Sequence, residues 1–350
     1  MQRDCASAFC GNRIGRWRML APTMKILLWK IGALGDVVMT TALVRQLRRQ
    51  LPDAQIDYLT GRACAVVLEG NPHLDKVVTF DEQILHRARA SRVGEVLPLL
   101  RGYDAVFVLD KHWIFGLLAW LARVPIRVGF ARRAWEGALH THRVPYGPVR
   151  HEIDCYLDLA EAWGLQVDHA DTRLELPPPL PCALPPAPYT VLANSGGANP
   201  GESSVVRRMP DALFRQLVDQ CAQRGTVVFL GAAAERDYYE ALARAATVNL
   251  CGRASLRESW RVLQGAEAVY TTDTGLMHMA AALNPRVTAI FGPTHPERKC
   301  PPGVRWVWAD ESTYDSRYEV FGRLPAGRYF GTLRVADILQ PTHEPAREAA

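Results

Sequence analysis

One short stretch of the sequence combines residue types suited to binding a charged, hydroxyl-bearing ligand. Asp273, Thr274 and Gly275 follow a run that predicts the end of a strand, and His278 lies one turn into the small-residue helix predicted over 276–283. A helix N-terminus beside a glycine-containing turn presents free backbone amides and binds anions. Asp273 can accept hydrogen bonds from sugar hydroxyls. We therefore expect a site that holds an anion and a hydroxyl-bearing group together.

A second strand unit follows this stretch directly. Residues 287–291 are apolar and are followed by Gly292, Pro293 and Thr294. Adjacent parallel strands aim their carboxyl ends at one edge of the sheet, where open α/β sheets bind ligands. We therefore expect Gly292 and Thr294 to lie near Asp273.

A further candidate, Asp36, lies near the start of the chain. It follows the predicted strand 24–31 and the turn 32–35, and it begins a helix that is predicted to continue to residue 49. The helix dipole there stabilises a carboxylate and lowers its pKa. A carboxylate in a cleft can still accept a proton from a hydroxyl while that hydroxyl forms a new bond. The structural alternative is a plain N-cap, a position at which Asp is favoured.

A polar, glycine-rich turn supplies candidate phosphate ligands. It covers residues 194–201 after the predicted strand 189–193, and Arg207 and Arg208 come shortly before the next predicted helix. Backbone amides and guanidinium groups hold phosphates in such settings. Ser195 and Arg207 are therefore candidate ligands, with an ordinary surface loop as the alternative.

These motifs resemble those of glycosyltransferase family 9, the heptosyltransferases of lipopolysaccharide core assembly. The matching segments are Asp273-Thr-Gly-Leu-Met-His-Met-Ala-Ala-Ala-Leu283, Phe291-Gly-Pro-Thr-His-Pro296 and Gly35-Asp-Val-Val-Met-Thr40. The resemblance covers most of residues 24–340. It implies an α/β protein of the GT-B type, with two Rossmann-like domains whose parallel sheets face each other across a cleft. It also implies an ADP-heptose donor bound mainly by the second domain. A glycine-capped turn in an unrelated α/β protein is the alternative.

The resemblance also implies roles for individual residues. Asp36 matches the catalytic base, although Thr41 replaces a Pro that is frequent nearby. Arg207 stands where many members carry a phosphate-binding Lys, and Met209 replaces their usual Trp. Because Arg and Lys differ in geometry, the sequence leaves open how Arg207 would contact the phosphate. Glu235 matches a nucleotide-side Glu, with a plain first-turn helix residue as an equal alternative. The implied donor-binding residues are Ser195, Arg207, Glu235, Ala254, Asp273, Thr274, Gly275, Leu276, His278, Gly292 and Thr294.

Repeated strand–helix alternation predicts parallel sheets in two domains. We expect an acceptor-binding domain over residues 24–175 and a nucleotide-sugar-binding domain over 189–340. A proline-rich linker over 176–188 joins them. The leader over 1–23 and the tail over 341–350 are expected to be disordered and loose.

Charge and composition limit the partners. The net charge of +5 on 350 residues is too small and too scattered to indicate nucleic-acid binding. Arg132, Arg133 and Arg143 lie in a basic segment that could face an anionic glycolipid or glycan acceptor, with a solvated loop as the alternative. The eight cysteines are scattered and fit a reducing compartment. No apolar run is long enough to span a membrane. We therefore expect a cytoplasmic protein, with peripheral contact to the inner membrane as a further expectation.

The expected activity is inverting, metal-independent transfer of a heptose from ADP-heptose to a lipopolysaccharide core or related glycan acceptor. The sequence has no Asp-x-Asp motif, and its histidines lack compact metal-ligand spacing, so neither a metal nor a cofactor is predicted. A family-9 enzyme with another nucleotide sugar or acceptor, and a non-catalytic nucleotide-binding protein, are the alternatives. A dehydrogenase is disfavoured because the turn 32–35 lacks the Gly-x-Gly-x-x-Gly spacing.

Overall fold

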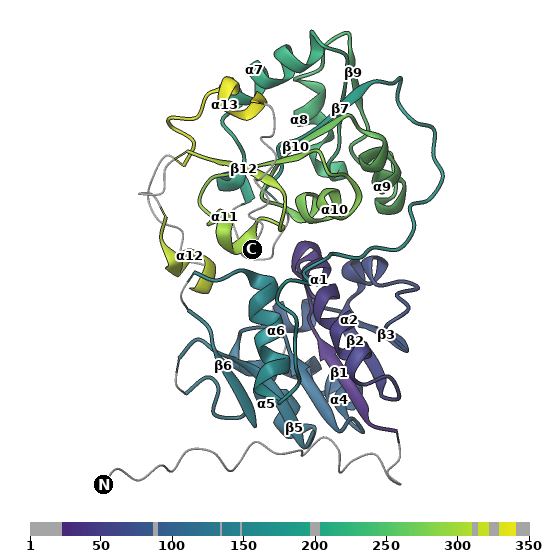
Figure 1. Cartoon of the computed structure of the whole chain (residues 1–350), viewed down its shortest axis with the longest axis vertical. Coiled ribbons are helices and arrows are strands. Elements are labelled where there is room, and N and C mark those ends of the chain that lie inside the picture. Colours follow the sequence, from purple (N-terminus) through teal and green to yellow (C-terminus); the bar gives the residue numbers. More distant parts are fainter. Residues whose placement is uncertain are drawn as a thin grey trace, which may run out of the picture.

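Two six-stranded sheets, each flanked by helices, form the body of the molecule (Figure 1). The computed structural model describes residues 23–86, 90–133, 135–147, 149–196, 204–309, 314–321 and 329–340. Neighbouring strands are parallel throughout both sheets. The predicted α/β class with two parallel sheets is confirmed.

The first sheet has the strand order β3-β2-β1-β4-β5-β6. A parallel sheet that is covered on both faces needs apolar residues at successive positions, and residues 26–29 of β1 are wholly buried. The strands are β1 (Lys25–Trp29), β2 (Gln55–Gly61), β3 (Lys76–Phe80), β4 (Ala105–Val108), β5 (Ile126–Ala131) and β6 (His142–Pro145). The helical elements are α1 (Leu34–Met39), α2 (Thr41–Gln50), η2 (Arg62–Val67), α3 (Gln83–His86), η3 (Ala90–Glu95), α4 (Leu97–Leu100), α5 (Trp113–Leu121) and α6 (Glu152–Ala162).

The helix predicted to run from Asp36 to residue 49 is divided into α1 and α2. The division falls at Thr40, which is fully buried. Its hydroxyl donates a hydrogen bond to the carbonyl of Val37 at 2.7 Å and lies 2.8 Å from the hydroxyl of Tyr58. Hydroxyl side chains compete for backbone acceptors in this way and often bend helices.

The second sheet has the strand order β12-β11-β10-β7-β8-β9. Its strands are β7 (Tyr189–Ala193), β8 (Thr226–Phe229), β9 (Thr247–Asn249), β10 (Ala268–Thr272), β11 (Val287–Phe291) and β12 (Arg305–Trp308). The helical elements are η4 (Ser204–Arg207), α7 (Asp211–Ala222), η5 (Ala233–Glu235), α8 (Arg236–Glu240), α9 (Leu256–Gly265), α10 (Gly275–Leu283), α11 (Pro296–Lys299), α12 (Ser316–Phe321) and α13 (Val335–Leu339). Because β10 lies between β7 and β11, the strand that precedes Asp273 and the strand that precedes Gly292 are neighbours in this sheet.

The proline-rich connection between the sheets passes beside α9 (Figure 1). The amide of Leu180 donates to the carbonyl of Arg257 at 3.1 Å, and Arg257 Nη2 donates to the carbonyl of Pro178 at 2.6 Å. The predicted domain limits remain a proposal. Apart from Thr23, the predicted leader and tail lie outside the described residues. Within the described ranges, no helix has the length and apolar character that crossing a membrane requires.

Candidate active site

A cavity of about 160 Å³ lies between the two domains. The first domain contributes residues that follow β1 and β4. The second contributes Arg207 of η4, residues that follow β10 and β11, and part of α12. The cavity is lined by Ala33, Gly35, Asp36, Lys111, Arg207, Asp273, Thr274, Gly275, His278, Thr294, Lys299, Tyr318 and Glu319. It therefore collects residues from motifs that are far apart in the sequence.

Two glycines allow the domains to meet beside this cavity, where α1 packs against α10. A Cβ on Gly35 would lie 2.5 Å from Cδ2 of His278. A Cβ on Gly275 would lie 3.2 Å from the Cβ of Leu34. The missing side chains let two backbones approach closely, and the Gly-Asp and Asp-Thr-Gly motifs therefore meet each other.

Asp36 lies in the first turn of α1, and its carboxylate is partly exposed to the cavity. The ammonium nitrogens of Lys30 and Lys299 are 3.5 Å and 3.6 Å from its oxygens. Burial raises the pKa of Asp36, but the charges of Lys299, Lys30 and Lys111 outweigh burial and hold it well below its usual range. The carboxylate is therefore ionised at neutral pH and able to accept a proton.

Glu152 is the centre of a buried charge cluster next to Asp36. It lies in the first turn of α6 and is fully buried. Lys111 Nζ is 2.8 Å and Lys299 Nζ is 3.2 Å from its oxygens, and the hydroxyl of Tyr146 donates to the same carboxylate. Burial raises the pKa of Glu152, but the two lysines lower it far below the usual value. A buried carboxylate without these partners would be strongly destabilising.

The second domain brings Arg207 and Asp273 to the same cavity. Arg207 Nη1 is 3.7 Å from Asp273 Oδ2, and Arg207 Nε donates to the hydroxyl of Tyr318 at 3.1 Å. The segment that follows Arg207 is held by Asn194, a buried residue at the end of β7. The amide of Asn194 donates to the carbonyl of Met209 at 3.1 Å and accepts from its N–H at 2.7 Å. This pair of bonds fixes the backbone that presents the guanidinium.

Several buried polar atoms at the cavity have no hydrogen-bond partner among the described residues: Asp273 Oδ2, Thr274 Oγ1, His278 Nδ1 and Thr294 Oγ1. Buried polar groups are normally hydrogen-bonded, so this group indicates a ligand with several polar atoms. Burial lowers the pKa of His278 to about 4. Its imidazole is therefore neutral at pH 7 and carries one donor and one acceptor nitrogen.

The cavity brings together some of the predicted site residues and leaves others at a distance. Those that line it are Asp36, Arg207, Asp273, Thr274, Gly275, His278 and Thr294. Those predicted for the donor that do not line it are Ser195, Glu235, Ala254, Leu276 and Gly292. The roles of both groups remain predictions.

The donor-side residues outside the cavity have structural contacts of their own. Glu235 accepts hydrogen bonds from Arg208 at 2.8 Å and from the amide of Ala232 at 2.9 Å. The carbonyl of Gly292 accepts from Trp308 Nε1 at 3.0 Å. A ligand contact at either residue would add to these bonds.

The predicted acceptor residues lie on the first domain, outside the cavity lining. Arg132 forms an ion pair with Glu136 at 2.9 Å, and its Nη1 donates to the carbonyl of Val320 in α12 at 3.2 Å. Arg133 and Arg143 are exposed. Arg132 is thus part of the contact between the domains.

Sequence reasoning named neither Ala33 nor Gly35 as a site residue, and it missed four cavity residues with polar side chains: Lys111, Lys299, Tyr318 and Glu319. Lys111 comes shortly after β4, and a charged residue at the carboxyl end of a parallel strand was an available signal. Lys299 ends the short helix α11, and no local pattern marks it. Tyr318 and Glu319 lie in α12, outside the matching motifs.

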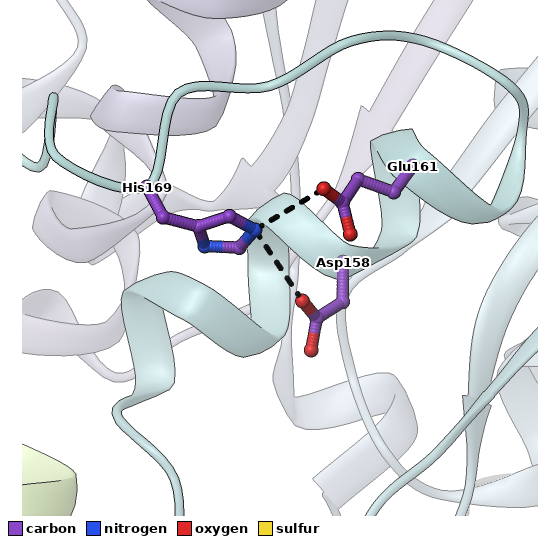
Figure 2. Close-up of side chains that lie close together, drawn as sticks. All are labelled: Asp158, Glu161 and His169. Carbon is purple, nitrogen blue, oxygen red and sulfur yellow. Dashed lines mark hydrogen bonds and ion pairs between the residues drawn. The ribbon is translucent and has the colours of Figure 1, made fainter.

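A separate histidine–carboxylate cluster lies on and beside α6 (Figure 2). His169 Nδ1 is 2.9 Å from Asp154, and its Nε2 is 3.3 Å from Glu161 and 3.8 Å from Asp158. Ligand atoms of Asp158, Glu161 and His169 lie within 4.8 Å of one another, which is close enough to hold a metal ion. Burial lowers the pKa of His169, but the hydrogen bond and charge of Asp154 outweigh it and raise the pKa. Ion pairing therefore accounts for these positions.

Comparisons with known proteins agree with this geometry. A family profile described as glycosyltransferase family 9 (heptosyltransferase) matches residues 98–315. Lipopolysaccharide heptosyltransferase 1 of Pseudomonas aeruginosa is 30% identical over 301 residues, which cover 78% of this chain and 80% of that protein.

Solved structures share the fold. ADP-heptose lipopolysaccharide heptosyltransferase II of Escherichia coli superposes with a TM-score of 0.65 at 21% identity, covering 86% of this chain and 95% of that chain. A second E. coli heptosyltransferase, solved with ADP-2-deoxy-2-fluoro heptose, gives a TM-score of 0.65 at 20% identity and covers 82% and 94% of the two chains. The predicted GT-B arrangement is confirmed.

Proposed function

Because this chain belongs to glycosyltransferase family 9, the heptosyltransferases, we propose that it moves a heptose from ADP-heptose to a lipopolysaccharide core or related glycan, with inversion and without a metal ion. The observation that carries the proposal is the cavity lined by Asp36 of the first domain and by Arg207 and Asp273 of the second. A candidate base and groups suited to a sugar diphosphate meet in one cavity, which supports transfer between two substrates.

In the proposed reaction the acceptor hydroxyl gives its proton to the carboxylate of Asp36. The hydroxyl oxygen forms a bond to the anomeric carbon of the heptose. The bond from that carbon to the β-phosphate oxygen breaks on the opposite face, and its electron pair leaves with ADP. A single displacement inverts the anomeric configuration. General-base catalysis of this kind contributes roughly a hundredfold to ten-thousandfold in rate.

The departing diphosphate needs positive charge and hydrogen-bond donors. Arg207 lines the cavity, and the N-terminus of α10 and the backbone after β11 open toward the same region. Preorganised groups of this kind stabilise developing negative charge. Lys111 also lines the cavity and adds positive charge there. We base the proposed independence from metal ions on these groups.

Donor recognition is assigned to the residues whose buried polar atoms lack a hydrogen-bond partner among the described residues. Asp273, Thr274, His278 and Thr294 present such atoms at the cavity, and a heptose and its diphosphate carry enough hydroxyl and phosphate oxygens to pair with them. We retain Ser195, Gly275, Leu276 and Gly292 as neighbours of the sugar diphosphate and Glu235 and Ala254 as neighbours of the nucleotide. The E. coli heptosyltransferase solved with ADP-2-deoxy-2-fluoro heptose supports the choice of an ADP-sugar.

The acceptor is assigned to the first domain. An anionic glycolipid or glycan would pass Arg132, Arg133 and Arg143 on its way to Asp36. Guanidinium groups pair with carboxylates and phosphates in a bidentate manner. These arginines lie outside the cavity lining and would therefore contact parts of the acceptor remote from the reacting hydroxyl.

An aromatic face on the same domain suggests where the inner membrane lies. Trp113, Trp120 and Leu121 are exposed on α5, and their i, i+7, i+8 spacing places them on one side of the helix. The ring of Trp135, which is 57% exposed, lies 6.4 Å from that of Trp113. Tryptophan is favoured at the bilayer interface. We therefore propose that this face rests on the cytoplasmic leaflet, close to a lipid-anchored acceptor.

The deciding experiment uses purified protein, ADP-heptose and a core acceptor that lacks the heptose, in the presence of EDTA. Mass spectrometry detects the product, and the anomeric coupling in its NMR spectrum reports inversion or retention. UDP- and GDP-sugars are tested in parallel. Transfer from ADP-heptose alone supports the proposal, whereas transfer only from another nucleotide sugar replaces the donor and keeps the enzyme class. Loss of transfer in EDTA that added magnesium restores would contradict metal independence.

A further inference from the structure

Lys299 belongs to the second domain, but its side chain reaches into the first. It ends the helix α11, and its Nζ is 3.6 Å from Oδ1 of Asp36 and 3.2 Å from Oε1 of Glu152. The side chain is 16% exposed, and it lines the cavity. Lys299 therefore joins the proposed base to a fully buried acid across the domain boundary.

Neighbouring contacts hold α11 against the first domain on both sides of Lys299. Arg298, which is wholly buried, donates from Nη2 to the carbonyl of Gly147 at 3.0 Å. His151 donates from Nε2 to the carbonyl of Cys300 at 2.8 Å. Because these bonds cross the domain boundary, the ammonium of Lys299 reaches the base only while the two domains are in contact.

The other cations near Asp36 are anchored within the first domain. Lys30, which follows β1, donates to Asp110 at 2.6 Å. Lys111 is held by Glu152 at 2.8 Å. These positions do not depend on the second domain. Among the groups that the second domain presents to Asp36 are the neutral imidazole of His278 and the ammonium of Lys299.

Lys299 faces acids on three helices and a phenol that follows β6. Glu152 is on α6, Asp36 is on α1 and Glu319 is on α12, and the phenol is that of Tyr146. Lys111, which shares Glu152 with Lys299, and the imidazoles of His151 and His278 also interact with its charge. Burial lowers the pKa of Lys299, but Glu152 and Asp36 outweigh it and raise the pKa well above 10.5. Lys299 therefore carries a full positive charge. Several neighbouring positive charges lower the pKa of Asp36 against the effect of burial, and the charge of Lys299 has the largest effect among them.

We propose that Lys299 is a positioning residue for Asp36: it orients the carboxylate and supplies the positive charge that the carboxylate faces, and it does so only when the donor domain is in place. This inference rests on the proposed role of Asp36 as the base. Contact between the domains then orients the carboxylate of Asp36 at the same time as it brings the donor to the acceptor. Proton removal is thereby tied to the presence of the donor domain.

A double-mutant cycle tests whether Lys299 acts through Asp36. Lys299→Met should lower kcat about tenfold to a hundredfold, the size of effect expected from a misplaced reacting group, while the dissociation constant for ADP stays within about twofold of the wild type. Lys299→Arg should recover much of the loss because it keeps the charge. In an Asp36→Asn background, Lys299→Met should have little further effect. Lys76→Met, at an exposed lysine on β3, is the matched control.

Two results would overturn the inference in an active enzyme. One is an unchanged kcat in Lys299→Met, and the other is a loss of ADP affinity that matches the loss of rate, which would make Lys299 a donor ligand. If the residual rate of Asp36→Asn is too small to measure, the rate of Lys299→Arg tests the proposal instead. A folded Lys299→Arg protein that is as slow as Lys299→Met would contradict the proposal.

A second measurement needs no substrate and separates this inference from the proposed function. Carbon-13 NMR of the aspartate carboxyls, assigned with Asp36→Asn, follows the titration of Asp36 directly. In Lys299→Met the pKa of Asp36 should lie above its wild-type value, and in Lys76→Met it should not move. An equal pKa of Asp36 in the wild type and in Lys299→Met would contradict the inference. Absence of heptose transfer by the wild type would instead refute the proposed function.

Discussion

Gly35 and His278 touch across the boundary between the two domains. A Cβ on Gly35 would lie 2.5 Å from Cδ2 and 3.1 Å from Nε2 of the imidazole. The imidazole is itself buried, with 3% of its surface exposed, so it has little room to withdraw. The distance between Asp36 and the donor residues is therefore set in part by the absence of one methyl group.

Gly35→Ala should open the contact between α1 and α10. Overpacking of this kind typically costs about 1–3 kcal/mol, and we expect kcat to fall by about tenfold or more because the reacting groups are separated. Affinity for ADP should change little, since the donor residues lie on one domain. Gly94→Ala is the control because its added Cβ would meet nothing within 4 Å. Equal kinetics for the two variants would show that the contact is not needed.

Asp36→Asn should abolish most turnover and leave ADP binding intact. The amide keeps the size of the side chain but cannot accept the acceptor proton, so we expect kcat to fall by roughly a hundredfold to ten-thousandfold. Steady-state transfer and calorimetric ADP titration measure the two effects. If turnover survives, another group is the base.

Arg207→Ala should weaken ADP binding through the diphosphate. A hydrogen bond to a charged group is worth about 1.5–3 kcal/mol, which corresponds to a dissociation constant raised about tenfold to more than a hundredfold. Adenosine, which lacks the phosphates, should bind the variant and the wild type equally. Unchanged ADP affinity would refute the assignment of Arg207, and weaker binding of both ligands would point to a wider structural change.

His169 should stabilise the fold in a pH-dependent way. Its folded-state pKa is raised above the ordinary 6.5, chiefly by Asp154 acting against burial. The ion pairs therefore contribute fully below about pH 6.5 and lose their effect as the pH rises through the folded-state pKa. His169→Gln should lower the free energy of unfolding by less than about 1 kcal/mol at pH 5.5, because the pairs are partly exposed, and should have no effect at pH 8.5.

Urea unfolding at the two pH values measures the effect of His169→Gln. Asp154→Asn should reproduce the loss at pH 5.5, and the double variant should add little to it. A loss of equal size at both pH values would mean that packing, and not charge, explains the contribution of His169.

Trp120→Ser should reduce binding to anionic phospholipid vesicles. Trp120 is 50% exposed on α5, so its removal should alter membrane contact without disturbing the core. Flotation with phosphatidylglycerol-containing vesicles measures bound protein, and transfer to a soluble acceptor fragment should be unaffected. Trp306→Ser is the matched control, because Trp306 is 45% exposed but lies on β12 of the second domain. Equal flotation of the two variants would exclude the α5 face.

The fold and the central motifs could be predicted from sequence because their signals are local. The strands on which Asp36 and Asp273 depend are apolar runs that end in glycine-containing turns, and parallel sheets direct such ends to one edge. Lys299 could not be predicted in this way. Its partners Asp36 and Glu152 lie on helices of the other domain, and only the packing of two domains brings the three charges together.

The same limit applies to the predicted residues that lie outside the cavity. Glu235 and Gly292 occupy positions typical of ligand-binding turns, and the structure engages both in bonds to the protein itself. A sequence pattern identifies a turn but not how far its side chain lies from a second domain. Arg132 illustrates this, because its contact with α12 depends on a segment almost two hundred residues later, at Val320.

The contribution of α12 to the cavity has a consequence for the timing of synthesis. Tyr318 and Glu319 line the cavity together with Asp36, which leaves the ribosome close to three hundred residues earlier. A nascent chain that ends after β12 would possess the strands of both sheets but not the partner that Arg207 finds in Tyr318. A complete cavity lining would therefore arise late in translation.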